Sequence, residues 1–288
     1  MSAHDDYRAI DAVNFSTLKA LRDSPAHYQE ALRAGRAGEG DTRSRGMLRA
    51  VHTLVLEPDV FRDDYAVWDG GSRRTNAYKA WSADVGDRTE LTEKEHADAV
   101  QISGAVLANP DALAVLTPGD GWSVAAEITM LWTDDETGLA CKGRADIVRI
   151  HPVHGAQVYD LKTVQSNAPR LLSAMCARMA WHVQAAHYAA GVQAMLRKVE
   201  HPAAAVPVRA GLVCVESRRP HDVAVWNLDG ETTLWAGEQE RAALLSRLAE
   251  CTAAGEWPGR HDGPQTLYLP SWAYDDTDDD AGFWESDR

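Results

Sequence analysis

Apolar residues in the first third of the chain recur every three or four positions, which is the spacing of one helix face. Met47, Val51 and Val55 follow this spacing and predict a helix from Arg43 to Leu56 that ends before Pro58. Capping residues and prolines predict further helices, the last two of them exposed, at residues 14–21 (capped by Asn14 or Ser16), from Pro25, at 74–84 and at 92–108 (capped by Thr92).

The middle of the chain changes to alternating and continuous apolar runs bounded by turn residues, which is the signal of β-strands. Strands are predicted at 124–132, 139–150, 157–163, 208–217 and 222–228, with helices at 169–180, 183–197 and 232–254. On the last helix Trp235, Leu245 and Leu248 are expected to lie on one apolar stripe. A strand-rich centre embedded in helices predicts a single α/β or α+β domain over residues 1–273.

Composition narrows the class of protein. The 288 residues carry a net charge of −14, which argues against broad, non-specific binding to nucleic acid. No apolar run is long enough for a membrane span, and the N-terminus does not read as a secretory signal. The cysteines are isolated, without a C-x-x-C pair, so we expect a reducing, cytoplasmic setting and no disulfide framework, thiolate zinc site or iron–sulfur cluster; they are Cys141, Cys176, Cys214 and Cys251.

The negative charge is unevenly distributed. Seven acidic residues and no Lys or Arg lie between Tyr274 and Asp287, so residues 274–288 are predicted to form an acidic, disordered tail. The first fifty residues, by contrast, hold eight Lys or Arg against seven acids. The folded body is therefore less repulsive to a polyanion than the net charge suggests.

The candidate chemistry centres on Asp160-Leu161-Lys162, within a predicted strand. Because side chains alternate along a strand, Asp160 and Lys162 share one face. Such a pair alone reads as an exposed ion pair worth about 0–1 kcal/mol. Asp146 and Glu127, on the two preceding strands, change this interpretation, since three neighbouring carboxylates repel unless they are protonated or bound to metal. Oxygen ligands suit Mg²⁺ or Mn²⁺; separate surface acids are the alternative.

These residues resemble the PD-(D/E)XK nuclease superfamily, most closely its RecE-type (exodeoxyribonuclease VIII-like) phage exonuclease domain, which is related to the RecB and lambda exonucleases. The resemblance covers about residues 12–273. It departs from the superfamily name at Ala145, which stands where the motif has proline. The segments that carry it are Ser16–Lys19 with Ser24–Tyr28, the helix around His52, Asp146 followed by Asp160-Leu161-Lys162, Gln184 with Tyr188, and Gly255–Pro258 with Leu267–Pro270.

The resemblance implies a restriction-endonuclease-like core, a central mixed sheet flanked by helices, and roles for individual residues. Two Mg²⁺ or Mn²⁺ ions are expected per site. Lys162 would orient the attacking water, while Gln184 and Tyr188 would hold the phosphate backbone or support Lys162. The metal ligands implied are His52, Glu127, Asp146, Asp160 and the carbonyl oxygen of Leu161.

The implied activity is 5′-to-3′ exonucleolytic digestion of linear duplex DNA in phage-type recombination, with a single-strand annealing protein as a possible partner. The resemblance also implies a homo-oligomeric ring, since RecE-type and lambda-type exonucleases are ring-shaped. The charge gives a second reason, because an acidic chain has little long-range attraction for DNA and would hold it by topology. Two alternatives remain open: a RecB-like single-strand or flap nuclease, and a catalytically silent DNA-binding or assembly module. Basic residues of the N-terminal helices are expected to receive the strand without reading its sequence.

Overall fold

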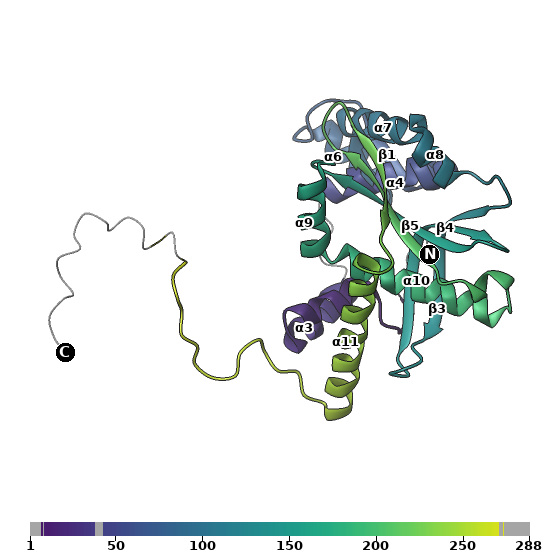
Figure 1. The fold of residues 1–288 in the computed structure, drawn as a ribbon. Coiled ribbons are helices and arrows are strands. Elements are labelled where there is room, and N and C mark those ends of the chain that lie inside the picture. Colours follow the sequence, from purple (N-terminus) through teal and green to yellow (C-terminus); the bar gives the residue numbers. More distant parts are fainter. Residues whose placement is uncertain (1–6, 8, 38–42, 271–272, 274–288) are drawn as a thin grey trace, which may run out of the picture.

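A five-stranded mixed sheet forms the centre of the chain in the computed structural model, which describes residues 7, 9–37, 43–270 and 273 (Figure 1). In spatial order the strands are β3 (Ser123–Thr133), β4 (Ala140–His151), β5 (Gly155–Val164), β6 (Arg209–Glu216) and β7 (Val223–Leu228). Strands β5 and β6 are parallel, and the other neighbours are antiparallel. The predicted mixed α/β class and its five strands are confirmed.

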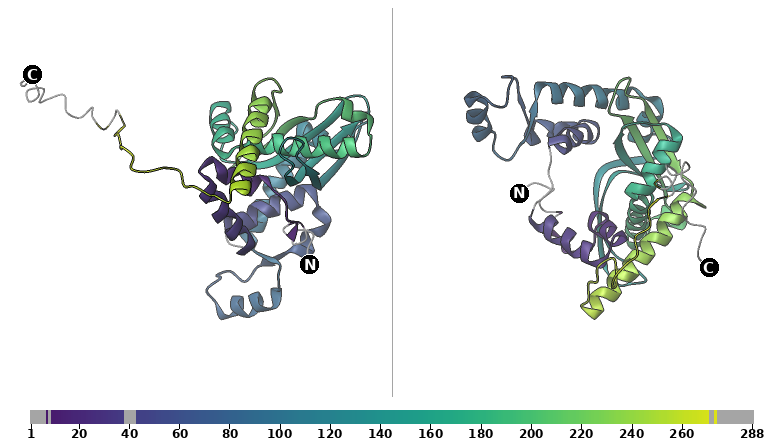
Figure 2. Two further views of the ribbon diagram at one scale, coloured as in Figure 1. Left: turned by 90° about the horizontal axis from the view of Figure 1, so that it is seen from below. Right: turned by 90° about the vertical axis from the view of Figure 1, so that its left-hand side faces the viewer.

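Helices cover both faces of this sheet (Figure 2). The helices α4 (Arg43–Leu56), α7 (Glu93–Ala108) and α8 (Pro110–Leu116) cover one face, and α10 (Trp181–Lys198) covers the other. The alternation of side chains along the strands explains the two cores. Ile147 and Leu161 pack with α4 and α7, whereas Val148 and Val158 pack with α10.

The N-terminal segment begins with a capped helical turn. The Asn14 side chain accepts a hydrogen bond from the backbone N–H of Thr17 at 2.9 Å, so Asn14, and not Ser16, is the N-cap. The elements that follow are α2 (Phe15–Leu18), the 3₁₀ helix η1 (Lys19–Arg22) and α3 (Pro25–Ala37). Phe15, Leu18 and Leu21 are buried in a cluster with Val183 of α10, which fixes this segment against the start of that helix.

The remaining elements connect these layers. Helix α9 (Pro169–Met179) precedes α10, and the long α11 (Thr233–Ala254) packs on α10. A Cβ atom at Gly237 of α11 would lie 2.2 Å from the carbonyl oxygen of His182, so only glycine permits this close approach. The other short elements are η2 (Pro58–Val60), α5 (Phe61–Asp64), α6 (Asn76–Val85) and η3 (Pro202–Ala205).

Two features differ from the sequence predictions. A second sheet, two parallel strands β1 (Tyr65–Trp68) and β2 (Thr89–Thr92), was not predicted, because strands this short show no clear alternation. The predicted exposure of α7 is wrong: Ala99, Ile102 and Val106 are fully buried in the main core. The charged residues in the first half of α7 concealed this buried face.

The stripe predicted on α11 also needs correction. Trp235 is 54 % exposed, and the neighbouring Leu234 is the buried residue. Leu245 and Leu248 are buried as expected. The stripe therefore starts one position earlier than the aromatic residue suggested.

Two further observations concern the ends of the chain and its long helices. Within the described ranges no single helix is long and apolar enough to cross a membrane, although α7 and α8 together meet that criterion across an 87° bend. After α11, Trp257 stacks on Tyr28 of α3 and Arg260 pairs with Asp23, and the chain then extends away from the body up to residue 270 (Figure 1). The predicted acidic tail, 274–288, lies outside the described residues.

The burial of α7 can be tested by paired substitutions. Ile102→Ala should lower the free energy of unfolding by about 2–5 kcal/mol, because it leaves a cavity in the core. Val100→Ala, on the exposed side of the same helix, should change it by less than about 0.5 kcal/mol. Urea denaturation measures both, and equal effects would contradict the position of α7.

Candidate metal centre

Three acidic residues form a row across neighbouring strands. The pairs Ala126–Ile147 and Ile128–Ala145 place Glu127 of β3 opposite Asp146 of β4. The ladder between β4 and β5 ends at the pair Ile147–Tyr159, and continuing its register by one step places Asp146 opposite Asp160. The structure therefore brings the three predicted carboxylates onto one line through the sheet.

The backbone ladder is interrupted along this row. Glu127 has φ of +54° within a strand, a left-handed conformation that costs a non-glycine residue free energy. On the other side of Asp146, pairing between β4 and β5 has ended. The Asp146 carboxylate instead accepts a hydrogen bond from the Leu161 backbone N–H at 2.8 Å. A side chain thus satisfies a backbone donor that the ladder leaves open.

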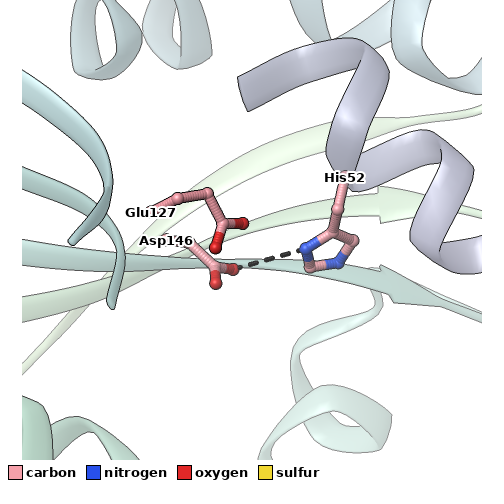
Figure 3. Close-up of side chains that lie close together, drawn as sticks. All are labelled: His52, Glu127 and Asp146. Carbon is pink, nitrogen blue, oxygen red and sulfur yellow. Dashed lines mark ion pairs between the residues drawn. The ribbon is translucent and has the colours of Figure 1, made fainter. Parts of the chain in front are cut away.

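His52 approaches Glu127 and Asp146 from the face of the sheet that α4 covers, opposite to α10. It lies on α4, and its Nδ1 is 3.5 Å from an Asp146 oxygen (Figure 3). His52, Glu127 and Asp146 each offer one ligand atom, and these three atoms lie within 4.8 Å of one another. Carboxylate oxygens with one imidazole nitrogen suit Mg²⁺ or Mn²⁺, so the donor set fits the predicted divalent ion.

The electrostatics of the cluster also favour a cation. Burial, and then the charge of Asp146, raise the pKa of Glu127 to about 7. Burial, and then the charge of Asp160, raise the pKa of Asp146. Burial lowers the pKa of His52, which favours the neutral imidazole that ligates metals. The raised pKa values mean that protonation would relieve the repulsion between the carboxylates, and a divalent ion would take the place of the protons.

Arg144 is a site residue that sequence analysis did not single out. Its Nε lies 2.5 Å from a Glu127 oxygen, and it also contacts Glu57 at 3.3 Å. Arg144 precedes Asp146 by two positions on β4, and this spacing was the only available signal. The partner that a charge at Glu127 requires is therefore an arginine on the adjacent strand.

Lys162 and Asp160 form a separate network on the α10 side. They make an ion pair, and Gln184 bridges them. Lys162 Nζ donates to Gln184 Oε1 at 2.9 Å, and Gln184 Nε2 donates to Asp160 Oδ1 at 2.9 Å. Asp160 thus faces Lys162 and is not part of the three-residue cluster with His52. The predicted roles of Asp160 and the Leu161 carbonyl as metal ligands stay predictions.

Tyr188 completes this network. Its hydroxyl accepts a hydrogen bond from Gln184 Nε2 at 3.1 Å. Burial, and then Asp160, raise the pKa of Tyr188 well above its ordinary value, so the phenol keeps its proton. A Cβ at Gly143 would lie 3.0 Å from the Tyr188 ring, which shows how closely the ring packs on β4. These are the contacts of residues that position Lys162 and Asp160.

A mixed sheet with a row of acids, the last followed two positions later by lysine, is the arrangement of a PD-(D/E)XK domain. The chain belongs to the family described as "PDDEXK-like domain of unknown function (DUF3799)", whose model matches residues 14–267. The superfamily resemblance is thereby confirmed. No curated protein matches the chain.

One solved structure shows the same fold. A crystal structure described as "Putative exonuclease" from Eubacterium rectale aligns over 96 % of each chain, with a TM-score of 0.56 and 13 % identity. At this identity the similarity concerns the fold alone. The crystal structure of SSO0001 aligns with a TM-score of 0.26 and 14 % identity over 76 % of this chain and 88 % of the other.

The raised pKa of Glu127 predicts how stability depends on pH. The folded chain holds this proton more tightly than the unfolded chain, so the metal-free protein should lose stability as the pH rises from 4.5, the ordinary value, to about 7. Asp146 acts in the same direction. Melting temperatures measured with and without Mn²⁺ should diverge as the pH rises. A metal-free profile that Glu127→Gln leaves unchanged would contradict this.

The left-handed backbone at Glu127 gives a second prediction. Glu127→Gly and Glu127→Ala both remove the carboxylate, and both should abolish stabilisation by Mn²⁺. The glycine variant should nevertheless be more stable than the alanine variant by about 1 kcal/mol, because only alanine retains the strain. If residue 127 instead had an ordinary extended backbone, the alanine variant would be the more stable of the two, because glycine loses more entropy on folding. Thermal unfolding of the two variants decides between these outcomes.

Proposed function

We propose that this chain is a divalent-metal-dependent nuclease that hydrolyses phosphodiester bonds in DNA. The observation that carries the proposal is the convergence of Glu127, Asp146 and Asp160 on one row, with His52 on one side and Lys162 on the other. Such a site combines metal ligands with a positioned cation beside them. Membership of a PDDEXK-like family supports the same class of reaction.

The residues divide the work between binding and orientation. His52, Glu127 and Asp146, together with Asp160, would hold divalent ions, which when bound polarise a phosphoryl oxygen and acidify water. Lys162 orients the attacking water. Gln184 fixes the positions of the Lys162 and Asp160 side chains through its two hydrogen bonds, and Tyr188 in turn holds Gln184 by a hydrogen bond.

We further propose exonucleolytic action on linear duplex DNA, in the 5′-to-3′ direction and in phage-type recombination. The name of the Eubacterium rectale protein supports exonucleolytic action, and the RecE-type sequence resemblance supports the duplex substrate, the polarity and the role in recombination. A homo-oligomeric ring and an annealing partner belong to the same proposal. The ring would retain DNA by topology, because the net charge of −14 gives little long-range attraction.

One assay tests the reaction and separates the alternatives. End-labelled linear duplex, covalently closed circular duplex, flap and single-stranded DNA are incubated with Mg²⁺, Mn²⁺ or chelator. The proposal predicts metal-dependent loss of label from the 5′ end of linear duplex and no action on closed circles. Preference for single strands or flaps would indicate the RecB-like alternative. Binding without hydrolysis under every condition would indicate a silent module.

The roles of Lys162 and Asp160 make a quantitative prediction. Lys162→Ala and Asp160→Ala should each reduce hydrolysis by at least about 10²-fold while the protein remains folded by circular dichroism. Lys94→Ala is the matched control, because Lys94 is 88 % exposed on α7 and contacts neither network. Normal rates in either site variant would refute the assignment of the site.

A further inference from the structure

Lys19 is a positive charge without a counter-charge at the edge of the Lys162 network. It lies on η1 and is half-buried. In the part of the chain that the structure describes, its ammonium has no carboxylate partner and no hydrogen bond, and its nearest aromatic contact is the Phe15 ring, 5.9 Å away. Part of this side chain is thus buried while its charge has no counter-charge among the described residues.

The neighbouring cations, in contrast, are balanced. Arg22 pairs with Glu240 at 2.7 Å, and Lys162 pairs with Asp160. Arg22 also donates to the backbone carbonyl oxygens of Ala177 and Arg178, at 3.2 and 3.3 Å. Lys19 is thus the member of this group that lacks a partner.

The packing places Lys19 near Lys162. Arg22 contacts residues 177 and 178 at the end of α9, and Lys162 Nζ lies 5.4 Å from the ring centroid of Trp181, which starts α10. Both side chains therefore reach the same helix junction. Lys19 is three residues from Arg22 in a 3₁₀ helix, where side chains at that spacing lie one above the other.

The electrostatics agree with this placement. Burial first, and then the charges of Lys162 and Arg22, lower the pKa of Lys19. Three cations that gather around one helix junction repel one another, and an anion between them would relieve the repulsion. Asp160 already pairs with Lys162 and Glu240 with Arg22, so among the described residues no carboxylate remains for Lys19.

We propose that Lys19 binds a non-bridging oxygen of a backbone phosphate in the DNA strand, next to the phosphate that is hydrolysed. This inference rests on the proposed nuclease function. A phosphodiester supplies the single negative charge that Lys19 lacks, and lysine binds phosphate as a compact point charge. Lys19 would fix the position of the strand without reading its sequence.

The test combines a charge-removing variant with neutral linkages in the DNA. Lys19→Met removes the ammonium and keeps the length of the side chain, Lys19→Arg keeps the charge, and Lys94→Met is the exposed control. Single-turnover cleavage is measured on duplexes that carry one methylphosphonate linkage at successive positions near the cleaved end. Binding of the same DNA is measured in chelator at several salt concentrations.

The wild type should lose about tenfold in rate at one linkage beside the cleaved one, the loss typical of one charge-assisted hydrogen bond. Lys19→Met should lose about as much rate on ordinary DNA, with no further loss at that linkage. For this variant, the slope of log Kd against the logarithm of the salt concentration should fall by about 0.7–0.9. Lys19→Arg should retain most activity. The melting temperature of Lys19→Met should not fall, because the variant removes an unpaired half-buried charge.

The outcomes separate this inference from the nuclease proposal. If the wild type cleaves DNA and Lys19→Met matches Lys94→Met in rate and salt slope, the inference is wrong and the function stands. Equal further losses for Lys19→Met at every linkage would also overturn it. If the wild type does not cleave DNA, the nuclease proposal fails, and the salt slopes alone decide whether Lys19 binds phosphate.

Discussion

The candidate site depends on an interruption of the β-ladder at the row that contains Glu127, Asp146 and Asp160. A continuous ladder would pair the backbone here and direct neighbouring side chains to fixed faces. Instead, Glu127 adopts a left-handed backbone, and the Asp146 carboxylate replaces the backbone as acceptor for the Leu161 N–H. The interruption lets acidic side chains from three strands approach one another in the middle of the sheet. With regular backbone pairing, each would stay on the face that its position in the strand dictates.

The free-energy cost of gathering these charges is distributed over two separate networks. On one side Glu127 pairs with Arg144, and burial raises the pKa of Glu127 and of Asp146, which favours protonation within the cluster with His52. On the other side Asp160 pairs with Lys162, and Gln184 fixes both. The His52 cluster and the lysine proposed to orient water are therefore adjacent, and Asp160 lies between them. The phosphate contact proposed for Lys19 would add one more positive charge beside this second network.

Long apolar strands and capped helices could be predicted from the sequence, because their signals are local. The order of Glu127, Asp146, Asp160 and Lys162 along the chain also indicated one site, because consecutive strands joined by short turns lie side by side in a sheet. The pairing of Arg144 with Glu127 and the positive φ of Glu127 could not be predicted, because both depend on register between strands. The burial of α7 was missed for a similar reason: its apolar face becomes recognisable only once α4 packs on it.

The central claim is that His52, Glu127 and Asp146 form a divalent-metal site. Anomalous X-ray diffraction from crystals of the full chain grown with Mn²⁺ tests it most directly. The account predicts a manganese peak within bonding distance of all three side chains, about 2.0–2.3 Å from each ligand atom, with Glu127 released from Arg144. A fully occupied peak elsewhere, or none at this cluster at millimolar Mn²⁺ and pH 8, would contradict it.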